Sequence, residues 1–165
     1  MAESLTITAS SKSEIYQELL PQIEAVISSE TNITANLANV TAILKEAFGW
    51  FWVGFYMCDS DTQLVLAPFQ GTLACTRIKK GGGVCGTAWE RGETIVVDDV
   101  EKFPRHIACS SLSRSEIVVP IWVGKEVIGV LDVDSESLST FDQEDQKGLE
   151  EICNVISKMI IRCEK

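Results

Sequence analysis

The sequence has few basic residues and a single histidine. It carries 14 lysine and arginine residues against 24 aspartate and glutamate residues, for a formal net charge of −10, and its one histidine is His106. A chain this negative repels nucleic acid phosphates and anionic lipid, whereas a small cationic or zwitterionic ligand is compatible with it. With one histidine, a structural zinc site would have to be assembled from widely spaced residues, so we expect no bound metal or cofactor.

Long apolar runs and targeting signals are also missing. No apolar run reaches the roughly 20 residues that cross a bilayer. The first residues, MAESLTITASSKSE, have neither a basic start nor an apolar stretch, so we expect no signal or transit peptide and a cytoplasmic location. Because 45% of the 165 residues are apolar, the chain can bury a sizeable core. We expect one domain over residues 1–165, with a weakly ordered N-terminus at 1–12.

Cysteine, by contrast, is plentiful, with six residues in a chain where structural disulfides are not expected. Cys75, Cys85 and Cys109 lie in the strings LACTRI, GGGVCGTA and HIACSS, each beside a turn or a helix start, and they form no C-x-x-C pair. We interpret these three as redox cysteines. The other three are expected to be structural: Cys58, Cys153 and Cys163.

Apolar periodicity predicts helices at both ends of the chain. One helix is expected over residues 13–29, where Pro21 should kink or break it, and a second over residues 33–48, stopped by Gly49. A last helix is expected to begin after Thr140, with Gln143 completing a capping box, and to run to about residue 162.

Between these helices apolar residues recur at every second position, which predicts strands. A short helix that stops near Gly92 interrupts them. Helices at both ends around such strands predict an α+β sandwich with a central antiparallel sheet of five or six strands. The expected strands cover residues 50–58, 63–70, 73–78, 94–99, 115–123 and 126–135.

A glycine motif precedes the short helix. Gly81, Gly83 and Gly86 satisfy G-x-G-x-x-G, the pattern that holds a dinucleotide pyrophosphate at a helix start. The following helix is too short, and the surrounding elements do not alternate as in a βαβ unit. A tight turn between strand and helix, which places the backbone around Cys85 at a pocket, is the simpler interpretation.

Several uncommon strings together resemble one family. WVGFY from Trp52 is followed in order by APFQGTLAC, GGGVCGTA, RHIACSS, SEIVVPI and GVLDVDS. This series resembles the free methionine (R)-sulfoxide reductases, which are single GAF domains, from the second helix to the C-terminal helix. The resemblance implies a GAF-like sandwich and thiol-dependent reduction of free L-methionine (R)-sulfoxide to L-methionine.

The resemblance also implies roles for the three redox cysteines. Cys109 matches the nucleophile, whose sulfenic acid Cys75 would resolve as an intramolecular disulfide, which thioredoxin would then reduce. Cys85 matches the family's third cysteine, which lines the pocket or acts as an alternative partner. A homodimer is a further expectation from GAF domains in general.

Acids and aromatic residues complete the implied site. Glu116, Asp132 and Asp134 match the contacts to the substrate oxygen and amino group, and Trp52 and Tyr56 match the aromatic residues that hold its methyl group. Alternation places Asp132 and Asp134 on one face of their strand, where mutual repulsion would raise a pKa and keep one acid protonated. The competing interpretation is a solvated strand end.

Alternative interpretations remain for several residues and for the function. His106 could be a base for Cys109, but a surface-loop histidine is the simpler interpretation. Asp98 and Asp99 could belong to an acidic rim or lie on a loop. Trp50 and Trp52 are expected on one strand face, so at least one should be structural. The alternative function is a GAF-type module that senses a small molecule or a redox state.

Overall fold

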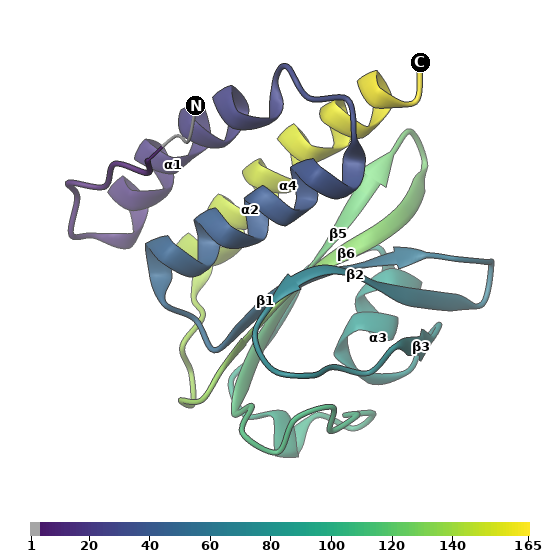
Figure 1. Cartoon of the computed structure of the whole chain (residues 1–165). Helices are drawn as coiled ribbons and strands as arrows, with labels where there is room; N and C mark the ends of the chain where they lie inside the picture. The colour runs from purple at the N-terminus through teal and green to yellow at the C-terminus, as the bar shows by residue number, and fades with distance from the viewer. Residues whose placement is uncertain (1–3) are drawn as a thin grey trace.

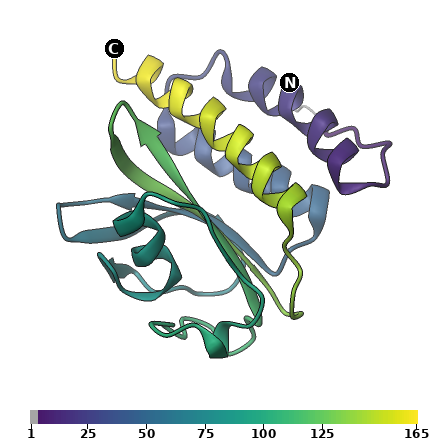
Figure 2. The ribbon, with the colours of Figure 1, turned by 180° about the vertical axis from the view of Figure 1, so that it is seen from behind.

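The computed structural model describes residues 4–165 and shows one six-stranded sheet between two unequal helical layers (Figure 1). Three long helices lie on one side of the sheet, two of them directly against it and one packed outside them, and one short helix lies on the other side (Figure 2). The long helices are α1 (Lys12–Ile27), α2 (Ile33–Phe48) and α4 (Gln143–Cys163), and the short one is α3 (Gly83–Arg91). No helix among residues 4–165 is long and apolar enough to cross a membrane.

The sheet is antiparallel throughout, with strand order β3-β2-β1-β6-β5-β4. The two longest strands form the predicted hairpin, and β2, β5 and β6 have the predicted bounds. β1 and β4 are shorter than predicted, and β3 begins four residues later than predicted. The α+β sandwich with five or six antiparallel strands is therefore confirmed. The strands are β1 (Trp52–Cys58), β2 (Gln63–Gln70), β3 (Arg77–Lys79), β4 (Ile95–Val97), β5 (Ser115–Val123) and β6 (Glu126–Ser135).

The helix ends follow the capping rules, with two corrections. Gly49 ends α2 in the left-handed conformation, at φ 65°, as predicted. Pro21 lies inside α1 and does not end it. The capping box of α4 is formed by Asp142 and Asp145, so the prediction that Gln143 completes it was wrong. Asp142 was missed because Thr140 is an equally good cap residue two positions earlier.

Alternation along the strands divides the interior into two parts. Val53 and Phe55 of β1 pack into the large apolar cluster beneath the long helices, whereas Trp52 and Tyr56 pack into a smaller cluster on the α3 side. Trp50 precedes the strand and belongs to the helix-side cluster, so the prediction that it shares a face with Trp52 was wrong. Each face of the sheet therefore has its own core.

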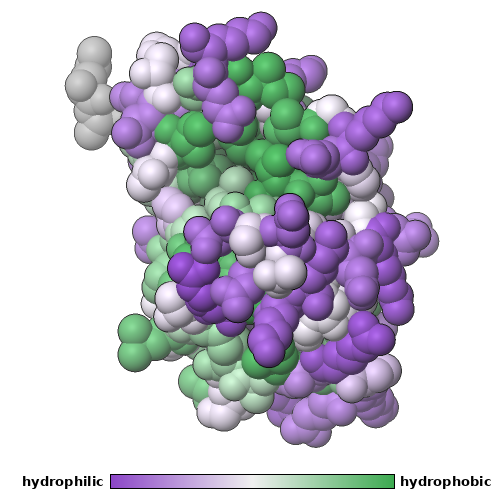
Figure 3. All heavy atoms as spheres, turned by 90° about the vertical axis from the view of Figure 1, so that its right-hand side faces the viewer, coloured by the Kyte–Doolittle hydropathy of each residue, from purple (hydrophilic) through white to green (hydrophobic). Residues whose placement is uncertain are grey.

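The N-terminal segment lies against α1. The backbone N–H groups of Thr6 and Thr8 donate to the Gln22 and Glu18 side chains, at 2.9 and 2.8 Å. Residues 1–3 lie outside the described residues, so a weakly ordered N-terminus stays a prediction. On the face drawn in Figure 3, apolar surface gathers at the helical end, and hydrophilic side chains cover much of the remainder.

Candidate active site

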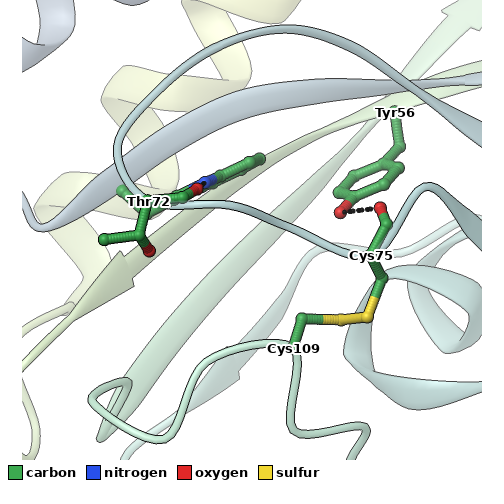
Figure 4. The surroundings of a disulfide bond; sticks show 5 residues. Tyr56, Thr72, Cys75 and Cys109 are labelled. Atoms are coloured by element: carbon green, nitrogen blue, oxygen red, sulfur yellow. Dashed lines mark hydrogen bonds between the residues drawn. A yellow bond between two sulfur atoms is a disulfide. The ribbon is translucent and has the colours of Figure 1, made fainter.

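A disulfide joins two loops on the α3 side of the sheet. Cys75, in the loop after β2, is bonded to Cys109, in the loop that leads to β5, with their Cα atoms 5.3 Å apart (Figure 4). Both cysteines are half-buried. The pairing implied by the family resemblance is thus present. Cys85 is a free, buried cysteine in the first turn of α3.

A cavity of about 50 Å³ lies between this disulfide and the sheet. It is lined by Cys109 and Cys85 and by residues of β1, β5 and β6 that the sequence singled out. Cys75 is not in the lining and reaches the cavity through its bond to Cys109. The other predicted site residues in the lining are Trp52, Tyr56, Glu116, Asp132 and Asp134.

Strand register brings the three acids together. Glu116 of β5 pairs with Asp134 of β6, and Asp132 lies two residues before Asp134, on the same face. Both aspartates also pair with β1, where Asp134 is opposite Trp52 and Asp132 is opposite Gly54. Glycine at position 54 leaves room for the Trp52 ring, which a Cβ atom there would meet. A solvated strand end is therefore excluded, because Glu116 and Asp132 are buried.

The acids are close neighbours in a site with no cation of the protein to balance them. None of the ion pairs found within residues 4–165 includes Glu116, Asp132 or Asp134. Burial, and then the charge of Asp132, raise the pKa of Glu116 and of Asp134 well above their usual range. Burial also raises the pKa of Asp132, although hydrogen bonding from Glu116 and Cys85 opposes the rise. The raised pKa values favour the protonated form of these carboxyl groups.

Ser113 was missed by sequence reasoning. Its hydroxyl donates a hydrogen bond to Asp134 Oδ1, and this bond opposes the rise in the pKa of Asp134 that burial causes. Ser113 is buried and lines the cavity. A serine in the loop string SLSRSE carries no local signal that distinguishes it from its neighbours, because its partner lies 21 residues away.

Two aromatic side chains are fixed by hydrogen bonds to the loop that carries Cys75. The Tyr56 hydroxyl donates to the Cys75 carbonyl oxygen at 2.8 Å (Figure 4). The Trp52 indole N–H donates to the Thr72 carbonyl oxygen at 3.0 Å. Their ring centroids are 6.1 Å apart. The aromatic residues therefore hold the cysteine loop as well as lining the cavity.

The glycine motif forms a tight turn. Gly81 and Gly83 have φ angles of 79° and 59°, and a Cβ on Gly86 would collide with the Lys79 carbonyl oxygen. The backbone from Gly82 to Cys85 lines the cavity. Burial, and then the charge of Asp132, raise the pKa of Cys85 well above that of an ordinary thiol.

The remaining candidates fall on different parts of the fold. His106 lies on a loop, is half-buried and lines the cavity, and burial lowers its pKa. Asp98 and Asp99 line a different surface hollow, and Asp99 caps the short 3-10 helix Val100–Lys102, so they lie on a loop away from the acidic site. Cys153 is buried beneath the helices, and Cys58 and Cys163 are half-buried.

Comparison with known proteins agrees with this geometry. The chain matches the GAF domain family over residues 30–160. It is 60% identical to GAF domain-containing protein A of Dictyostelium discoideum, over 94% of this chain and 99% of that protein. It is also 44% identical to the free methionine-R-sulfoxide reductase of Escherichia coli, over 90% of both chains.

A solved structure is similar over almost the whole chain. The free methionine-R-sulfoxide reductase of Neisseria meningitidis, in complex with its substrate, is 57% identical, covers 98% of this chain and 97% of its own, and superposes with a TM-score of 0.96. The chain thus belongs to the GAF domain family and, within it, to the free methionine-R-sulfoxide reductases, a family of oxidoreductases.

Proposed function

We propose that this protein reduces free L-methionine (R)-sulfoxide to L-methionine, with Cys109 as the nucleophile and Cys75 as the resolving cysteine. The observation that carries the proposal is the Cys75–Cys109 disulfide at the wall of a small cavity whose opposite wall holds three carboxyl groups. A redox-active pair, a proton source and a small pocket are the three elements that this reaction needs.

The proposed reaction has three steps. The Cys109 thiolate takes up the sulfoxide oxygen, which leaves methionine as a thioether and Cys109 as a sulfenic acid. The Cys75 thiol then attacks the Cys109 sulfur, which forms the disulfide and releases the oxygen as water. An external dithiol, for which we propose thioredoxin, reduces the disulfide to two thiols and becomes a disulfide itself.

The acidic wall supplies the proton for the first step. The sulfoxide oxygen becomes basic as the sulfur is reduced, and a carboxyl group that stays protonated at neutral pH can donate to it. Glu116 and Asp134 have the required raised pKa values. Asp132, in its ionised form, can bind the ammonium group of a free amino acid, which gives the three acids complementary roles.

Cavity size supports a preference for the free amino acid. A volume of about 50 Å³, lined in part by the Trp52 and Tyr56 rings, suits a small free ligand better than a continuing peptide chain. The same rings offer an apolar surface to the methyl group of the substrate and can stabilise positive charge at its sulfur. A peptide-bound sulfoxide should therefore be a poor substrate.

Exposed apolar residues near the disulfide support a protein reductant. Leu73 is 91% exposed, and Ile107 and Leu112 are 43% and 53% exposed, so apolar side chains flank both cysteines in the sequence. Exposed apolar residues beside a half-buried disulfide suit the docking of another protein. We also propose the cytoplasm as location, where such a reductant keeps thiols reduced. A homodimer stays a prediction for size-exclusion chromatography.

NADPH consumption in the presence of thioredoxin and thioredoxin reductase tests this proposal. We expect turnover with free methionine (R)-sulfoxide, little with the (S) form or a peptide-bound sulfoxide, and none after Cys109→Ser. Cys163→Ser is the matched control, because this cysteine lies far from the cavity, at the end of α4, and should leave the rate unchanged.

Single-turnover measurements separate the two cysteines. Pre-reduced Cys75→Ser should form one equivalent of methionine and then stop in the thioredoxin assay, whereas Cys109→Ser should form none. No turnover with any sulfoxide, in wild type and controls alike, would contradict the proposal and favour the GAF-type sensing module.

A further inference from the structure

One atom at the floor of the cavity is unexplained by the fold. Asp132 Oδ1 is buried and has no hydrogen-bond partner among the residues that the structure describes. The residue as a whole is 6% exposed and lines the cavity. An unpaired buried carboxylate oxygen is costly, and proteins keep one mainly where a ligand satisfies it.

Two further residues with ligand atoms lie close to the Asp132 carboxyl group. One sulfur or oxygen atom from each of Cys85, Glu116 and Asp132 lies within 4.8 Å of the other two, and all three residues are buried. They come from α3, β5 and β6, three separate elements, so the cluster is held by the fold. Shifts of less than about 1 Å toward the centre would bring the three atoms to the distances of a zinc site.

We propose that this cluster is a binding site for one borderline-soft divalent cation such as Zn²⁺, held by Cys85 Sγ and by one carboxylate oxygen each of Glu116 and Asp132. Water or Asp134 completes a tetrahedral coordination. On binding, the Cys85 thiol loses its proton to solvent, and its sulfur forms a bond to the cation. The ion is an external ligand that comes and goes, not a resident cofactor of the reductase.

Donor chemistry selects the class of cation. One thiolate with two carboxylates suits Zn²⁺ or Co²⁺, whereas Mg²⁺ and Ca²⁺ prefer oxygen alone. A divalent ion also balances two of the negative charges in a site that no protein cation balances within residues 4–165. The cavity of about 50 Å³ has room for an ion and one or two waters.

The site has a direct consequence for the reductase, and this part rests on the proposed function. The same two acids would contact methionine sulfoxide, so the cation and the substrate would compete for the cavity. Cys75 and Cys109 are not among the ligands, so the cation would bind to the disulfide form and to the dithiol form alike. That separates the proposed site from simple capture of zinc by a reduced cysteine pair.

Metal titration of the disulfide form provides the test. We expect wild type to bind one equivalent of Zn²⁺ in a competition with a chromophoric chelator. Cys85→Ser and Asp132→Asn should each weaken this binding at least tenfold, and Cys58→Ser, the matched control at a half-buried cysteine outside the cavity, should not change it. Co²⁺ should give a thiolate-to-metal charge-transfer band in wild type that is absent in Cys85→Ser.

Three outcomes would overturn the proposal: no stoichiometric binding, equal affinity in wild type and both cavity variants, or loss of binding in the Cys58→Ser control. Far-UV circular dichroism checks that each variant is folded. In a single turnover of pre-reduced enzyme without free thiol, Zn²⁺ should reduce the rate of methionine formation, and added sulfoxide should reverse the effect. If Zn²⁺ binds but does not slow this single turnover, the proposed competition between cation and substrate is wrong. If the enzyme forms no methionine even without zinc, the proposed function is wrong.

Discussion

The protein buries aspartates in two places that differ in how each carboxylate is satisfied. Under the helical layer, Asp145 is fully buried, accepts a hydrogen bond from the Tyr16 hydroxyl at 2.8 Å and forms an ion pair with Lys12 at 2.5 Å. It also accepts the backbone N–H of Asp142 at 3.0 Å. On the other side of the sheet, Asp132 has an oxygen without any such partner.

This contrast separates groups that stabilise the fold from groups kept ready for a ligand. A buried charge costs less free energy when ion pairs and hydrogen bonds satisfy it, and Asp145 fulfils that condition. Asp132 does not, and with Glu116 and Asp134 it places mutually repelling acids in one cavity. The helical layer therefore stabilises the protein, while the cavity retains unfavourable charge that a substrate or cation can relieve.

The largest effect should follow from neutralising the unsatisfied acid. Asp132→Asn should lower kcat/KM for methionine (R)-sulfoxide by about 100-fold or more, because the cavity loses a charge that contacts the substrate. The free energy of unfolding should stay the same or rise, because the change removes a buried charge that no ion pair within residues 4–165 balances. Steady-state kinetics and chemical denaturation measure the two effects.

The matched change under the helices should do the opposite. Asp145→Asn should lower the free energy of unfolding by about 2 kcal/mol, because it removes the buried ion-pair partner of Lys12 and weakens the bond from Tyr16. Turnover of the folded variant should match wild type. Equal losses of activity in the two variants would show that the contrast between the two aspartates is false.

Glycines that make room for aromatic rings sharpen the comparison further. Gly71 has φ 144°, and a Cβ there would collide with the Trp52 ring. Gly71→Ala should displace this ring and raise KM about tenfold, a loss of about 1.4 kcal/mol in substrate binding. Gly148→Ala, whose Cβ would meet the Tyr16 ring under the helices, is the control and should lower the unfolding temperature without changing KM.

The smallest effect concerns Asp142, the exposed ion-pair partner of Lys12, and the pH dependence of stability. Although burial opposes it, hydrogen bonds from Lys12 and from backbone N–H groups lower the pKa of Asp142 below 3.8. Its contribution to stability is therefore present above pH 3.8 and disappears as the pH falls through the lowered pKa. Asp142→Asn keeps the helix cap, so it should cost only about 0.5 kcal/mol at pH 7 and remove that acid dependence. Thermal unfolding between pH 2 and 7 measures the difference.

Local patterns in the sequence were sufficient to predict much of this structure. Alternation located β5 and β6 to the residue and placed Asp132 and Asp134 on one face, and Gly49 and Gly92 marked the helix ends correctly. The family strings added the pairing of Cys75 with Cys109. These features depend on neighbours in the sequence or on uncommon motifs.

What the sequence missed depends on contacts between distant segments. The bond from Ser113 to Asp134 and the unpaired Asp132 oxygen need the β5–β6 register and the position of α3 before they can be seen. Trp50 was assigned to the wrong face because the strand begins only at Trp52, and alternation holds only within a strand.

The alternation of β6 also sets how this protein can be re-engineered. Leu131 and Val133 belong to the helix-side core, and the alternating residues Asp132 and Asp134 line the cavity. One strand therefore contributes to the core and to the site through separate sets of residues. Protein engineering can therefore change the residues on one face of β6 and leave those on the other face intact. A single-residue insertion or deletion in β6 would exchange the two faces, so that carboxylates would point into the helix-side core and leucine into the cavity.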